Sequence, residues 1–142
     1  MRIIIILLAL LFATPVMAAD SYLCIAEQAA GFSYDKKSKK WKSTIFDTQD
    51  KIILKKPANE KNYKIFHHGE TESASECWAG FNKTGFIYCN KNEIGKDFTM
   101  NIETLRFQYI NTVGYVVNMN IIKQGREGNF TPFMQIGKCS KI

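Results

Sequence analysis

The chain has 142 residues and a formal net charge of +6 at pH 7, with 46% hydrophobic, 13% aromatic and 23% charged residues. This composition excludes an intrinsically disordered chain, and nine glycines and three prolines are too few for a low-complexity or collagen-like protein. A chain of this length is expected to form one domain around one hydrophobic core.

The N-terminal residues predict a secretory signal peptide rather than a part of the fold. Arg2 supplies a positive charge, residues 3–12 are an unbroken apolar run, and residues 16–18 offer the small or apolar side chains of a cleavage site. This run is shorter than the roughly 20 residues that a helix needs to cross a bilayer. We therefore expect a cleaved signal peptide at residues 1–18, a single secreted β-domain at 19–142, no transmembrane segment, and a periplasmic or secreted location. An uncleaved N-terminal anchor is the alternative.

Short stretches of period-two alternation follow along the chain, separated by residues that favour turns. After Cys24 a short helical turn is expected at residues 28–30, before Gly31 ends it. The strands expected in the first half of the chain are residues 22–26, 31–34, 41–46, 51–55 and 62–67.

The densest positive charge falls on a predicted hairpin tip at residues 35–40. Residues 36–64 hold ten lysines against three acidic residues, which gives a net charge of +7. One interpretation is a solvated turn that hinders edge-to-edge strand pairing. The other is a surface that binds lipid head groups, lipopolysaccharide phosphates, cell-wall polymers or an acidic protein. The candidate binding residues are Lys36, Lys37, Lys39, Lys40, Trp41 and Lys42.

One cluster has the residue types of a metal site, namely His67, His68, Glu70 and Glu72. If the preceding strand continues to His68, the two imidazoles point to opposite faces, which weakens a shared ligand role. A polar loop end is therefore the favoured interpretation, and no metal or other cofactor is expected.

All four cysteines lie beyond the predicted signal peptide, and an even number in an exported chain predicts two disulfides. The turn-forming residues 82–85 lie near the middle of the stretch between Cys77 and Cys89, so a hairpin there would place these cysteines opposite each other. Cys24 and Cys139 are then left to bond, which closes nearly the whole domain as one loop. The other two pairings remain open, whereas the absence of a C-x-x-C pair disfavours a zinc site.

Alternation continues through the second half of the chain. The residues that share one face are 98, 100 and 102, then 105, 107 and 109, then 115, 117 and 119, and finally 134, 136 and 138, opposite 133, 135, 137 and 139. Frequent short strands without a helix-period stripe predict an all-β domain, a small antiparallel barrel or sandwich of about eight strands with two disulfides. Its core is expected to take most of the aromatic residues Trp41, Trp78, Phe81, Phe86, Tyr88, Phe98, Phe107, Tyr109, Tyr115 and Phe133.

Several short motifs carry a resemblance to a family. They are YLCIA at residues 22–26, GFSY at 31–34 followed by Trp41, TLRF at 104–107 with GYV at 114–116, and TP at 131–132 before IGKCS at 136–140. With these motifs the chain resembles a group of short, signal-bearing proteins of uncharacterised function from proteobacteria and their prophages. The resemblance implies export and a common fold, and it contributes no catalytic residue. A looser similarity is to periplasmic lysozyme inhibitors, which are small, exported, disulfide-bearing β-barrels with basic targets.

The sequence offers no nucleophile or general base with a positioned partner. The favoured hypothesis is a non-catalytic exported binding protein, of the inhibitor or immunity type, acting on an envelope or extracellular macromolecule through residues 36–42. Its expected partner is a protein or an anionic envelope component, not nucleic acid. The alternatives are a small envelope enzyme or metal-binding protein that uses His67, His68, Glu70 and Glu72, and a structural or phage-related envelope component.

Overall fold

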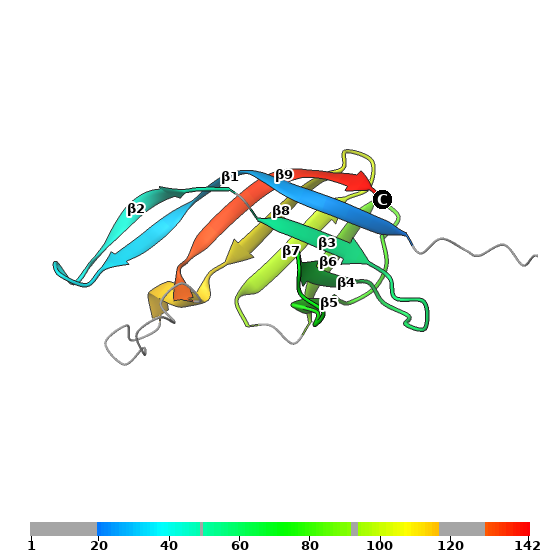
Figure 1. Cartoon of the computed structure of the whole chain (residues 1–142), viewed down its shortest axis with the longest axis horizontal. Helices are drawn as coiled ribbons and strands as arrows, with labels where there is room; N and C mark the ends of the chain where they lie inside the picture. Colours follow the sequence, from blue (N-terminus) through cyan, green and yellow to red (C-terminus); the bar gives the residue numbers. More distant parts are fainter. Residues whose placement is uncertain (1–19, 49, 92–93, 117–129) are drawn as a thin grey trace, which may run out of the picture.

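The structure, a computed structural model, describes residues 20–48, 50–91, 94–116 and 130–142. These residues form a closed eight-stranded antiparallel barrel with one extra strand, which confirms the predicted all-β fold (Figure 1). The strands are β1 (Ser21–Asp35), β2 (Lys40–Phe46), β3 (Lys51–Lys55), β4 (Lys64–His67), β5 (Ser75–Cys77), β6 (Phe86–Lys91), β7 (Lys96–Asn101), β8 (Arg106–Asn111) and β9 (Phe133–Lys141).

The first strand closes the barrel because it pairs along both of its edges. On one edge residues 21–25 pair with β3, and on the other residues 22–31 pair with β9. From β3 to β9 the strands are neighbours in chain order, so successive antiparallel strands complete the wall. The extra strand, β2, pairs with residues 29–35 of β1 and with no other strand in the described part of the chain.

Side chains that point inward fill the barrel, as expected for a closed sheet of this size. The inward positions of β1 begin with Tyr22, Cys24 and Ala26, which are buried, while Ile25 between them is exposed. The same alternation buries Phe98 and Met100 on β7. The other main members of the core are Ile52, Leu54, Tyr63, Ile65, Ile87, Phe107 and Tyr109.

Both predicted disulfides are present. Cys77 lies directly opposite Cys89 where β5 pairs with β6, and Cys24 lies directly opposite Cys139 where β1 pairs with β9. Each bond therefore joins neighbouring strands inside the barrel, and all four cysteines are bonded. Two structural disulfides are consistent with a periplasmic or extracellular protein.

The second half of β1 leaves the barrel together with β2. Residues 29–35 of β1 pair with β2 from Ala29 opposite Phe46 to Asp35 opposite Lys40. The pairing of β1 with β9 ends at Gly31, followed by a hydrogen bond from Phe32 N–H to the Pro132 carbonyl, so among the described strands residues 33–35 pair with β2 alone. We call residues 29–46 the arm, and Figure 1 shows it projecting from one end of the barrel.

The prediction of two strands separated by a helical turn at residues 28–30 was wrong, because β1 is continuous. Hydrogen bonding to β9 on one side and β2 on the other outweighs the local helix preference of the alanines. An irregularity does occur here, but it is a β-bulge between Ala26 and Gln28.

Two further expectations differ from the structure. Val113–Val116 form a 3-10 turn instead of the start of a strand, and residues 117–119 lie outside the described parts of the chain. The expectation that most of the aromatic residues pack in the core was wrong for an exposed set, whose accessible fractions are 65% for Trp78, 37% for Phe86, 51% for Tyr88 and 67% for Tyr115.

The predicted signal peptide, residues 1–18, also lies outside the described residues. Within the described ranges, no helix has the length and apolar character needed to cross a membrane.

Candidate functional site

Asp35 fixes the shape of the arm's tip. Its Oδ1 accepts hydrogen bonds from the backbone N–H of Lys37 at 2.9 Å and of Ser38 at 3.3 Å, and its Oδ2 accepts one from Lys42 Nζ at 2.6 Å. These bonds, that of Lys42 first, hold the pKa of the Asp35 carboxyl well below its usual range. Lys39 completes the turn in the left-handed region, with a φ of +53°.

The structure brings the predicted lysines together at this tip. The turn occupies residues 36–39, and β2 begins directly after it with Lys40, Trp41 and Lys42. All five lysines are exposed, whereas Trp41 is half-buried. Residues 32–46 hold five lysines and one aspartate, a net charge of +4. The arm therefore carries a concentrated positive charge beyond the rim of the barrel.

The arm has two different faces, because residues that pair across antiparallel strands point to the same side. One face continues the inside of the barrel and is polar towards the tip, where the Ser33 and Thr44 hydroxyls share a hydrogen bond of 2.7 Å. The opposite face continues the outside of the barrel. Its paired residues are Ala30 with Ile45, Phe32 with Ser43, and Tyr34 with Trp41.

Three aromatic rings lie near the lysine-rich turn, and those of Tyr34 and Trp41 are on the outer face. The ring centroids of Tyr34 and Trp41 are 5.3 Å apart, and those of Trp41 and Tyr115 are 5.8 Å apart. Contacts of this kind between tilted rings stabilise the part of the arm next to its turn. The sequence singled out Trp41 but missed Tyr34 and Tyr115. The hairpin register would have revealed Tyr34, whereas Tyr115 is distant in sequence and gave no signal.

An apolar surface continues from the arm onto the barrel. We call it the outer apolar patch, and its members are Phe32 (50% exposed), Ile45 (88%), Met134 (47%) and Ile136 (44%). Ala30 connects them, because it pairs with Ile45 on one side and with Met134 on the other. Sequence reasoning placed Met134 and Ile136 on one face of their strand, which is confirmed, but did not connect them to the arm.

The histidine cluster does not assemble into a metal site. His67 ends β4, and its ring lies 6.3 Å from that of Tyr109, whereas His68 is exposed in the following turn. Glu70 and Glu72 are exposed in the segment after this turn. Across residues 20–48, 50–91, 94–116 and 130–142, no three His, Cys, Asp or Glu side chains are grouped so as to hold a metal ion.

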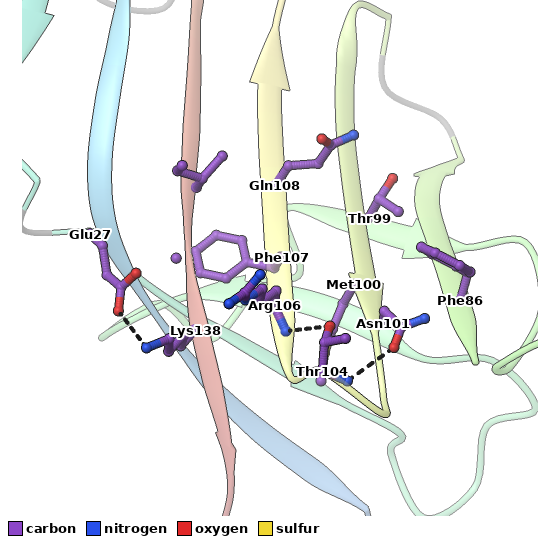
Figure 2. Close-up of a pocket in the computed structure, with 12 residues that line it drawn as sticks. Glu27, Phe86, Thr99, Met100, Asn101, Thr104, Arg106, Phe107, Gln108 and Lys138 are labelled. Atoms are coloured by element: carbon purple, nitrogen blue, oxygen red, sulfur yellow. Dashed lines mark hydrogen bonds and ion pairs between the residues drawn. The ribbon is translucent and has the colours of Figure 1, made fainter. Parts of the chain in front are cut away.

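A shallow, open groove of about 640 Å³ lies on the outer surface of β6 to β9. Figure 2 shows its lining, which runs from Phe86 on β6 across Thr99 and Gln108 to Lys138 on β9 and Glu27 on β1. Glu27 and Lys138 form an ion pair at 3.7 Å. The lining mixes a carboxylate, cations, amides and two aromatic rings.

A smaller pocket of about 290 Å³ lies where the arm joins the barrel, between Phe46 and Phe133. Gln135 belongs to its lining, and its side-chain nitrogen has no hydrogen-bond partner among the described residues. That nitrogen is also buried, since Gln135 is only 2% exposed.

No protein-family model, no curated protein and no solved structure matches the chain significantly.

Proposed function

We propose that the protein is a non-catalytic binding protein, exported by its N-terminal segment, whose arm contacts an anionic component of the cell envelope or an extracellular macromolecule. The observation that carries this proposal is the arm itself, which extends five lysines and one aspartate beyond the barrel rim. Such a protein acts by contact, as inhibitors and immunity-type proteins do.

The concentration of charge supports an anionic partner. A net charge of +4 confined to a narrow ribbon attracts opposite charge over a distance set by the Debye length, about 8 Å at physiological ionic strength. If the same lysines lay on the outer surface of the barrel, neighbouring carboxylates would offset their positive charge. At the tip, Lys42 pairs with Asp35, and this pair holds the turn that presents the other lysines.

The rigidity of the arm supports binding as its role. Seven residue pairs join its two strands, and Asp35 closes its tip through side-chain hydrogen bonds. The ring contact of Trp41 with Tyr115 also ties the arm to the end of β8. A surface that is ordered before binding loses less conformational entropy when the partner arrives.

The test is binding to a soluble polyanion, dextran sulfate, measured over a series of salt concentrations. The arm variant carries four changes that leave Lys42 and its bond to Asp35 intact. The control variant removes the same number of charges from exposed positions on the barrel. The two sets are Lys36→Gln, Lys37→Gln, Lys39→Gln and Lys40→Gln for the arm variant, and Lys51→Gln, Lys56→Gln, Lys61→Gln and Lys83→Gln for the control variant.

We expect the arm variant to lose on the order of a hundredfold in affinity at low salt and to show a shallower salt dependence, because fewer counterions are released. The control variant should stay within a fewfold of the original protein. Equal losses in the two variants would show that net charge alone governs binding, and the proposal would then be wrong.

A further inference from the structure

The outer apolar patch is not explained by binding to a simple polyanion. Phe32 and Ile45 are 50% and 88% exposed on the arm, and Met134 and Ile136 are 47% and 44% exposed on the adjoining strand. All four point to the outside of the sheet, on three strands that are neighbours. Contiguous exposed apolar side chains next to a charged segment mark an interaction surface.

The residues of this surface follow a graded order along the arm. Aliphatic side chains lie nearest the barrel, where Ala30 is flanked by Ile45 and Met134. Tyr34 and Trp41 come next, and the lysine-rich turn at residues 36–39 is last. Segments that lie in a membrane interface combine the same three components, with apolar groups at the acyl boundary, Trp and Tyr at the head-group level, and Lys near the phosphates.

Resting on the proposed function, we infer that the anionic partner of the arm is a lipid surface, on which the arm lies with its outer face against a bilayer containing anionic phospholipid. Phe32 and Ile45 enter the boundary between head groups and acyl chains. The lysines of the turn contact lipid phosphates, and Trp41 and Tyr34, which lie along the arm between the turn and the apolar side chains, contact the head-group region.

The positive charge and the exposed apolar side chains together favour a lipid surface over a soluble polyanion. A polyanion neutralises the lysines but offers no apolar phase for Phe32 and Ile45. A neutral bilayer accepts the apolar side chains but does not attract the +4 charge of residues 32–46. An anionic bilayer satisfies both, because its phosphates lie directly above its acyl chains.

The experiment measures co-sedimentation of the purified protein with vesicles of phosphatidylcholine alone and of phosphatidylcholine mixed with phosphatidylglycerol. Two double variants test the apolar contribution. The patch variant is Phe32→Gln with Ile45→Gln. The control is Trp78→Gln with Ile142→Gln, which removes one aromatic and one isoleucine side chain that are 65% and 64% exposed on the barrel and at the C-terminus.

We expect the protein to bind the mixed vesicles and to bind phosphatidylcholine alone at least tenfold more weakly. The patch variant should lose about tenfold in affinity for the mixed vesicles, since two large apolar side chains no longer leave water. Its affinity for dextran sulfate should be unchanged. The control variant should match the original protein with both vesicle types.

The outcomes separate this inference from the proposed function. If the protein binds dextran sulfate through the arm but not the mixed vesicles, or if the patch variant binds the mixed vesicles as well as the original does, the lipid inference is wrong and the proposed function stands. If the original protein binds neither the polyanion nor the vesicles, both are wrong.

Discussion

The two disulfides close loops of very different length, and this difference predicts how much each one contributes to stability. Cys24 and Cys139 are 115 positions apart in sequence, whereas Cys77 and Cys89 are 12 positions apart. Both bonds join paired neighbouring strands, and all four residues are at most 6% exposed. The double variants Cys24→Ala with Cys139→Ala, and Cys77→Ala with Cys89→Ala, therefore differ mainly in the length of the loop that is opened.

The magnitude follows from the entropy that each bond removes from the unfolded chain. The chain-entropy relation gives about 4.8 kcal/mol for the long loop and about 2.9 kcal/mol for the short one at 25 °C. Each double variant also loses two buried sulfur atoms, and this loss of packing is similar for the two pairs. We therefore expect the Cys24/Cys139 variant to be less stable than the Cys77/Cys89 variant by about 2 kcal/mol.

Urea unfolding under non-reducing conditions, followed by circular dichroism, measures both free energies of unfolding. The slope of the free energy against urea concentration should also rise more in the Cys24/Cys139 variant, because its unfolded chain expands further. A variant that is already unfolded in water ranks as the less stable of the two. If the Cys77/Cys89 variant loses as much stability as the other, or more, loop length does not govern these bonds and the reasoning is refuted.

Three smaller changes test local features, each by thermal or urea unfolding unless stated. Gly137→Ala should destabilise the barrel by about 1–3 kcal/mol, because a Cβ there would lie 2.1 Å from a backbone oxygen of β1. The control is Gly80→Ala, where the nearest atom to the added Cβ is 4.0 Å away, and its stability should be within about 0.5 kcal/mol of the original. Lys39→Gly should raise stability by up to about 1 kcal/mol, because glycine adopts the left-handed φ of the turn without strain; no gain would contradict this assignment. The pKa of the Asp35 carboxyl is lower in the folded state than in the unfolded state. The ionised carboxyl therefore stabilises the fold above pH about 4, the unfolded pKa, and this stabilisation is lost as the pH falls towards the folded pKa. A titration of the Asp35 carboxyl by NMR with an ordinary midpoint would contradict this.

Much of the barrel follows from local patterns in the sequence. The alternation in residues 133–139 predicted that Met134 and Ile136 share one face, and both are exposed, while Gln135 between them and Gly137 after them are buried. The pairing of Cys77 with Cys89 was also predictable, because both the strands and the turn between them are encoded within a short stretch. Such features depend on neighbours in sequence, which is why a single sequence is enough to find them.

The outward orientation of two exposed aromatic residues could also have been predicted from local patterns. Alternation puts Phe86 and Tyr88 on one face and Ile87 and Cys89 on the other, without saying which face is inside. A disulfide that bridges two strands of the barrel interior settles the question, since Cys89 points inward and so does Ile87. Phe86 and Tyr88 must then point outward, and the predicted disulfide contained this information.

The two faces of the arm were not predictable, because they depend on the bulge in β1. Counting alternate residues from the buried Cys24 assigns Ala26, Ala30 and Phe32 all to the inside. The bulge between Ala26 and Gln28 reverses this assignment, so that Ala29 points inward and Ala30 and Phe32 point outward. No residue type in this stretch predicts a bulge. It lies where β1 changes neighbours, from β3 to β2, while it stays paired with β9.

This account of the bulge predicts opposite results for two changes of one residue in the same strand. Gly31 faces inward, and a Cβ there would lie 2.1 Å from the carbonyl oxygen of Pro132. Insertion of one alanine after Gln28 moves Ala30 into this position and turns Phe32 inward, which should cost about 1–3 kcal/mol and weaken vesicle binding about tenfold, as in the patch variant. Deletion of Glu27, the extra residue of the bulge, keeps the faces of the arm and should cost less. Urea unfolding and vesicle co-sedimentation of the two variants decide this, and a deletion more damaging than the insertion would show that the bulge does not set the faces of the arm.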